Sequence, residues 1–200
     1  LVFSGLLKYD PKVQGFVDDL ASLKISEDKK DYVFTIKDNV QWHDGQPFTV
    51  DDVIFTYGLI QANEFQNLLL KANFQGVKIE QIGEKTVKFS LDRPNSFFIT
   101  NFNVGILPKH LLAETAVADL LNSQYNLQPV GTGPYKVSGM LQSSNDGIQK
   151  VILDRFDGYY SVKPKIKEVR FSVFPDEQSF MSEKGSINIL ARVSNSLMEL

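Results

Sequence analysis

Two different hydrophobic periods stand close together in this sequence, and they restrict its fold more than any other feature. In residues 31–38, Tyr32, Phe34 and Ile36 fall on one face of an alternating pattern, which predicts a strand with one buried side. In residues 50–62 the apolar side chains instead recur at helical spacing, which predicts an amphipathic helix. We therefore expect a protein of the α/β class, with mixed α+β structure.

The segment between these two elements has strong turn and cap signals. Residues 42–47, Trp-His-Asp-Gly-Gln-Pro, combine an Asp-Gly pair with a proline, which favours a tight turn. Thr49 precedes Asp52 by three positions, an approximate capping box with Asp in place of Glu. The helix is therefore predicted to begin at residue 50.

Shorter periodic segments complete the secondary structure. Strands are predicted at Val77–Ile79 and Val87–Leu91, with a hairpin at Gly83-Glu84, and a second helix is predicted from Pro108 to about Asn122. Later strands are predicted at 134–138, 148–155 (after a turn at Asp146-Gly147) and 166–174. A short helix within 174–186 followed by Ile187–Leu190 predicts a β-α-β crossover with a parallel strand pair.

These elements divide into a core sheet and an inserted unit. Residues 1–23 and 128–200 are predicted to form the core sheet with its helices, and residues 24–127 a β-rich subdomain inserted into it. Leu1–Leu7 already read as buried structure, so we expect the N-terminus of this chain to be a fragment boundary.

Composition excludes several classes of protein. The 200 residues are 42% apolar and 22% charged, as in ordinary globular proteins. The net charge is −3 with lysine and arginine scattered, so we expect no nucleic-acid partner. No apolar run approaches the length that spans a bilayer, and no export signal is visible.

Groups able to carry catalysis are scarce. His43 and His110 are the only histidines and cysteine is absent, which gives little support to a metal site. Because adjacent residues rarely face each other, His43-Asp44 favours a turn over an acid–base pair. The glycine-rich segment 131–135 lacks the Lys-Ser/Thr ending of a phosphate-binding loop. We therefore predict neither an enzyme nor a metal or cofactor site.

Aromatic side chains gather in residues 93–107, a polar segment without periodicity. Phe97, Phe98 and Phe102 lie there. Such residues either face a ligand or partner surface, or fill the space between subdomains. The sequence leaves both readings open.

Several segments, taken in order, resemble the family 5 extracellular solute-binding proteins. The most diagnostic is residues 32–53, which include Trp42-His43-Asp44-Gly45 and Asp51-Asp52-Val53. Leu1–Asp10 resembles the first helix and turn of that family. Further matches are Val17–Ala21, Ile106–Leu111, Gly131–Lys136, Tyr159-Tyr160 with Lys163–Ile166, and Phe174–Asp176, whereas Val17, Leu23-Lys24 and Asn188 depart from the usual residues.

The resemblance implies lobe I of a type II periplasmic-binding-protein fold, with the second lobe absent from this chain. Members of this family close two lobes on a solute and dock on a membrane permease. We therefore expect a monomeric solute-binding subunit of an ABC importer that captures peptides or similar solutes. It would be extracytoplasmic, either periplasmic or lipid-anchored at the cell surface.

The resemblance also implies roles for particular residues. Trp42, Asp44, Gly45, Gly131, Gly133 and Tyr135 are expected to be structural motif residues. From position alone, Phe65, Asn67, Phe102 and Asn103 are expected to contact the ligand. An extracytoplasmic sensory or chaperone-like domain with the same fold is the alternative, and the residues beyond Leu200 would separate the two.

Overall fold

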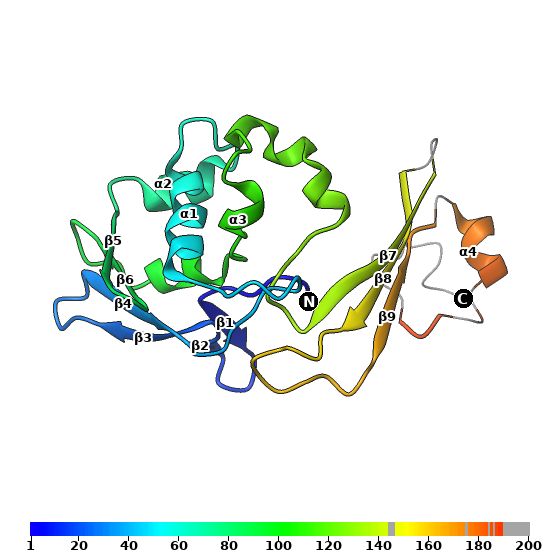
Figure 1. Ribbon diagram of the computed structural model, residues 1–200, viewed down its shortest axis with the longest axis horizontal. Helices are drawn as coiled ribbons and strands as arrows, with labels where there is room; N and C mark the ends of the chain where they lie inside the picture. The colour runs from blue at the N-terminus through cyan, green and yellow to red at the C-terminus, as the bar shows by residue number, and fades with distance from the viewer. Residues whose placement is uncertain (144–146, 175, 184, 186, 190–200) are drawn as a thin grey trace.

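The structure is a computed structural model and describes residues 1–143, 147–174, 176–183, 185 and 187–189. A four-stranded sheet with helices packed on it occupies one end of the molecule, and a three-stranded sheet occupies the other (Figure 1). Each strand pair among the described residues is antiparallel. The predicted mixed α+β class is confirmed.

The four-stranded sheet has the order β3-β4-β6-β5, with bounds β3 Ala21–Ile25, β4 Asp31–Ile36, β5 Lys78–Gly83 and β6 Thr86–Ser90. Tyr32, Phe34 and Ile36 of β4 are buried, as their alternation predicts. Phe34 lies opposite Val87 and Tyr32 opposite Phe89 in the register of β4 and β6. The predicted strands at 31–38, 77–79 and 87–91 and their hairpin are confirmed as β4, β5 and β6, whereas β3 was not predicted from the sequence.

The predicted first long helix is confirmed as α1, Val50–Gln61. Its N-terminus has the predicted capping box, in which the Thr49 amide donates to Asp52 Oδ2 at 2.9 Å. The helix buries Val53, Tyr57 and Ile60, and a short second helix, α2 (Leu68–Phe74), packs beside it. The two helices cover one face of the sheet (Figure 1).

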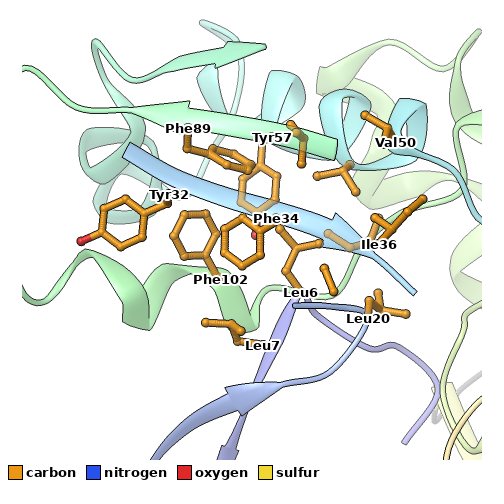
Figure 2. Close-up of a cluster of buried hydrophobic side chains, with 14 of the residues drawn as sticks. Leu6, Leu7, Leu20, Tyr32, Phe34, Ile36, Val50, Tyr57, Phe89 and Phe102 are labelled. Atoms are coloured by element: carbon orange, nitrogen blue, oxygen red, sulfur yellow. The ribbon is translucent and has the colours of Figure 1, made fainter. Parts of the chain in front are cut away.

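Aromatic rings fill the core beneath α1. Figure 2 shows Phe34, Phe89, Tyr57 and Phe102 converging on one space. The Phe102 ring lies 4.5 Å from Phe34 and 4.9 Å from Phe89, centroid to centroid. Phe102 is completely buried, and its segment forms a 3-10 helix, η1 (Phe98–Asn103), within the aperiodic stretch 93–107.

The N-terminal segment is a hairpin, and the prediction of a first helix there is wrong. Strands β1 (Leu7–Asp10) and β2 (Gly15–Asp18) pair in antiparallel register. The predicted turn after Tyr9 closes it, since Asp10 Oδ1 accepts the Lys12 amide at 2.8 Å. Leu6 and Leu7 are buried as expected, but an extended chain reaches the core here, with the Leu6 carbonyl accepting the Asp19 amide at 3.0 Å.

The predicted helix from Pro108 to Asn122 is also wrong in length. Only α3 (Lys109–Leu112) is α-helical, followed by the 3-10 turns η2 (Val117–Asn122) and η3 (Gln124–Leu127). Leu112 is buried, but Ala116 is exposed and extended. An apolar stripe with no surface to pack against does not hold a helix together.

The three later strands are confirmed as β7 (Tyr135–Ser143), β8 (Gly147–Arg155) and β9 (Glu168–Ser172), in the order β7-β8-β9. The helix of the predicted crossover is α4, Glu177–Glu183. Residues 187–189 are not a strand, so the predicted parallel pair is wrong for them, and Ile189 is exposed. Asp146 and Leu190 lie outside the described residues.

The first boundary of the predicted domain division does not coincide with a boundary between elements of the structure. Its boundary at residue 24 falls inside β3. Leu6, Leu7 and Leu20 also belong to the same buried cluster as the residues of the inserted unit. The division at 24 and 128 therefore remains a prediction, and the core itself runs across its first boundary.

Candidate functional site

The turn at 42–47 is built as predicted. The Trp42 amide donates to the Gln46 carbonyl at 2.9 Å, and the Gly45 amide donates to the Trp42 carbonyl at 2.9 Å. Gly45 has φ +87°, a left-handed conformation that glycine adopts without strain. Asp44 accepts the Gln46 amide at 3.1 Å and also contacts His110 Nε2 at 2.8 Å.

Asp52 fixes this turn against two helices. Its carboxylate is buried and accepts the Thr49 amide at 2.9 Å, the Lys109 amide at 2.9 Å and Trp42 Nε1 at 3.4 Å. One carboxylate thus joins the turn, the start of α1 and the start of α3. The sequence predicted only the capping role of Asp52, because its contacts with Trp42 and Lys109 depend on the tertiary structure.

His43 joins the turn to the glycine-rich segment. The Gly131 amide donates to Nδ1 at 3.1 Å, and Nε2 lies 3.0 Å from the Gly133 carbonyl. A backbone amide only donates, so Nδ1 is unprotonated and Nε2 carries the proton, which defines a neutral ring. Burial lowers the pKa of His43, against smaller opposing effects of the Gly133 carbonyl and Asp44. With both nitrogens bound to backbone, the ring has a structural role.

Gly131 and Gly133 are glycines because the N-terminal segment passes against them. A Cβ atom would lie 2.0 Å from the Val2 carbonyl oxygen at Gly131 and 2.2 Å from that of Leu1 at Gly133. The Gly133 amide donates to Val2 at 2.8 Å and the Tyr135 amide to Leu1 at 3.2 Å. These amides are occupied, so the segment does not form a phosphate cradle.

Two tyrosines, Tyr135, which is buried, and Tyr160, which is half-buried, complete the joint between the four-stranded and three-stranded sheets. The Tyr135 hydroxyl donates to the Ile166 carbonyl at 3.1 Å. The Tyr160 hydroxyl donates to Asp19 Oδ1 at 2.9 Å, and Lys8 Nζ lies 3.3 Å from the same oxygen. Burial, followed by the Asp19 carboxylate, raises the pKa of Tyr160. Asp19 was not singled out from the sequence, since nothing in its spacing marks it.

The four expected ligand contacts have different surroundings. Phe102 is completely buried in the core, so its ring offers no surface to a solute. Phe65 is half-buried against the core, and Asn67 is exposed but caps α2 by accepting the Leu70 amide at 3.1 Å. Asn103 is exposed at the end of η1. Their elements are neighbours, since Asn73 of α2 donates to Asn101 of η1 at 2.8 Å.

Two open hollows lie on this part of the molecule. One of about 590 Å³ runs beside α2 and the other, of about 430 Å³, lies between the starts of α1 and α3. The hollow beside α2 is lined by Gln61, Asn63, Leu68, Lys71, Ala72, Phe74, Gln75, Gly76 and Val77. Asn67 directly precedes this lining, and Leu68 and Leu69 are largely exposed there.

The described residues include neither a candidate metal site nor a candidate membrane span. Among residues 1–143, 147–174, 176–183, 185 and 187–189, no group of three or more His, Cys, Asp or Glu side chains could hold a metal ion. Within the same ranges, no helix is both long and apolar enough to cross a bilayer.

The fold is shared with solute-binding proteins of known structure, and comparison gives the family. The family described as bacterial extracellular solute-binding proteins, family 5 Middle, matches residues 15–198. The chain therefore belongs to this family of solute-binding proteins.

Similar proteins extend well beyond this chain. The oligopeptide-binding protein AppA of Bacillus subtilis is 29% identical over 193 residues, 94% of this chain and 35% of AppA. Its structure with a nonapeptide matches with a TM-score of 0.80 at 28% identity, covering 94% of this chain and 37% of that one. NikZ from Campylobacter jejuni, solved with Ni(L-His), matches at 0.78 and 31% identity, covering 93% and 36%. The chain thus spans about a third of the length of these relatives.

Proposed function

We propose that this chain is part of an extracytoplasmic solute-binding subunit of an ABC importer. The protein would capture peptides or similar solutes between two lobes and deliver them to a membrane permease. It would act as a monomer, periplasmic or lipid-anchored, and without catalysis. The observation that carries the proposal is the match of the family over residues 15–198 together with the fold shared with AppA.

The geometry of the motifs supports a binding role. The residues that first suggested chemistry, His43, Asp44 and the glycine-rich segment, have their polar groups bound within the protein. They stabilise the joint between two sheets. A lobe that must move as one rigid body during closure benefits from such a joint.

The proposed solute contacts are Asn103, Asn67 and the half-buried Phe65. Exposed amides at the ends of short helices can donate to and accept from a peptide backbone. Phe102 would act behind them by packing η1 against the core. Its role is therefore to hold Asn103 in place.

The class of solute is tested on the full-length protein purified from its own cells. Native mass spectrometry is expected to show co-purifying peptides of mixed sequence. A single metal chelate, the kind of ligand present in the NikZ structure, or a sugar would contradict the peptide part of the proposal. A transmembrane helix in the full-length protein in place of a second lobe would favour the sensory alternative.

The proposed contacts are tested with matched asparagine variants. Asn103→Ala is expected to weaken peptide binding about tenfold, the loss of one hydrogen bond to a polar partner. Asn122→Ala is the control, because Asn122 is also exposed at the end of a 3-10 helix. Isothermal titration with the co-purified peptides measures both, and equal affinities would remove Asn103 from the site.

A further inference from the structure

The loop between β8 and β9 has a charge opposite to that of the whole chain. From Arg155 to Arg170 there are five basic and two acidic side chains, a net charge of +3, whereas the whole chain has −3. The two acidic residues are neutralised locally, since Asp157 pairs with Arg155 at 3.1 Å and Glu168 pairs with Arg170. The excess charge therefore belongs to the lysines of the loop.

Those lysines are exposed and form no ion pair with the residues that the structure describes. Lys163, Lys165 and Lys167 are all exposed, and none forms an ion pair with any residue that the structure describes. Two apolar side chains are exposed among them: Val162 is 88% exposed and Ile166 63%. The loop thus presents ammonium groups and apolar side chains together.

The backbone of the loop is fixed by the joint described above. The Ile166 carbonyl accepts the Tyr135 hydroxyl at 3.1 Å, and the Lys167 carbonyl accepts the Arg155 amide at 2.8 Å. The Pro164 carbonyl accepts Arg155 Nη1 at 3.3 Å. Because hydrogen bonds from within the protein hold three carbonyls of the loop, its lysines project from an ordered backbone. Little backbone entropy is therefore lost when the loop binds.

We propose that residues 162–167 dock the protein on the anionic lipid headgroups of a membrane. Each lysine close to an anionic bilayer raises the partition coefficient roughly fivefold, and exposed apolar side chains enter the interface beside the headgroups. Lysine is a compact point charge that suits dispersed phosphates. Neither of the two hollows described above includes this loop, and a flat charged surface fits it better than an inserted peptide segment does.

This docking goes beyond solute capture, since it would hold the protein beside the membrane that contains the permease. The contact is small and therefore weak, since three charges and two apolar side chains give a rapidly reversible association. It leaves the proposed solute contacts on η1 and α2 free. Solute binding and lipid binding can therefore be measured independently on the same protein.

The test uses the full-length protein without any lipid modification, mixed with phosphatidylcholine vesicles with or without phosphatidylglycerol. Replacing Lys163, Lys165 and Lys167 together by glutamine is expected to lower the partition coefficient on anionic vesicles about 100-fold. The control replaces Lys24, Lys29 and Lys30, which lie on β3 and the turn before β4. It makes the same change in net charge and is expected to lower binding by no more than about twofold.

Other outcomes overturn the proposal. Equal losses in the two triple variants would show that net charge alone drives binding, and no vesicle binding at low salt would exclude lipid. Binding of a polyglutamate peptide through the loop, without vesicle binding, would assign it to an acidic protein surface. Peptide affinity is expected to be unchanged in both variants, so failure of lipid docking is distinguishable from failure of the proposed transport function.

Discussion

Tyr57 places a hydroxyl among aromatic rings with nothing to bind. The residue is completely buried, and its hydroxyl has no hydrogen-bond partner in the described part of the chain. The rings of Phe74 and Phe89 lie 4.9 Å from it, centroid to centroid. Burial raises the pKa of this phenol, so it stays neutral. The ring contributes packing, while the hydroxyl costs desolvation.

Tyr57→Phe is therefore expected to raise the free energy of unfolding by about 1 kcal/mol, because it removes an unsatisfied buried group. Urea denaturation measures the change. The matched control is Tyr32→Phe: the Tyr32 hydroxyl donates to the Asn95 carbonyl at 2.9 Å, so its removal should lower the free energy by about 1 kcal/mol. Destabilisation by both changes would mean that Tyr57 has a partner after all.

His43 should make stability depend on pH in a defined window. Its folded-state pKa is lowered, chiefly by burial, while an unfolded histidine titrates near about 6.5. As the pH falls below about 6.5, the unfolded state therefore binds more protons than the folded state does. The contribution of His43 to stability is complete above about pH 6.5 and is lost progressively as the pH falls towards the folded-state pKa. Lys136 adds to the lowering, and Asp44 opposes it.

The prediction is that His43→Gln shows a smaller loss of unfolding free energy between about pH 7.5 and about pH 5 than the unmodified protein does. Chemical denaturation at each pH measures it. His110→Gln serves as the control, because it leaves the His43 contacts in place. It should therefore retain the pH dependence of stability that His43 contributes. An unchanged pH dependence in His43→Gln would exclude His43 as its source.

At the scale of elements, the start of α1 depends on one carboxylate surrounded by donors. Asp52→Asn would put an amide NH2 against the Lys109 amide or against Trp42 Nε1, both of which donate. We expect a loss of about 2–3 kcal/mol in unfolding free energy. Asp51→Asn is the neighbouring control: its pair with Lys109 Nζ is exposed, so the expected change is below about 1 kcal/mol. Thermal denaturation of the two variants should therefore differ clearly.

The elements also show where sequence patterns succeed. β4 and α1 were predictable because each has one face against the core, and burial imposes a period on the sequence. The segment 108–122 has a helical period but buries only its first turn, so the pattern overestimates the helix. η1 is too short to show a period, and Phe98 and Phe102 therefore resembled loop residues although they are core.

The candidate site was less predictable than the fold. The turn, the cap and the two glycines were recognisable because their chemistry is local. The links from Asp52 to Lys109, from His43 to Gly131 and from Tyr160 to Asp19 join distant parts of the chain. No spacing in a single sequence encodes such links, and the proposed solute contacts remain predictions for the same reason.

At the scale of the whole molecule, the two sheets are joined where glycines let the N-terminal segment pass. Gly133→Ala is expected to lower the free energy of unfolding by several kcal/mol, since its Cβ would overlap the Leu1 and Val2 carbonyl oxygens. Hydrogen exchange at the Tyr135 amide should accelerate in the same variant. Gly58→Ala is the control: nothing lies within 4 Å of its Cβ position in α1, so it should stabilise the protein by about 0.5–1 kcal/mol. Equal effects of the two changes would contradict this account of the joint.

The same joint sets an order of events during folding. Among the described residues, the Leu1 and Val2 carbonyls accept backbone hydrogen bonds from Tyr135 and Gly133, so this contact closes a loop that contains the entire four-stranded sheet. Loops of that length close slowly compared with neighbouring strands. Strands β3, β4, β5 and β6 can therefore pair early, while residues 1 and 2 pair later with the glycine-rich segment. Until that contact forms, the backbone carbonyls of Leu1 and Val2 lack these partners, and the segment that holds them is a place where a chaperone has reason to bind.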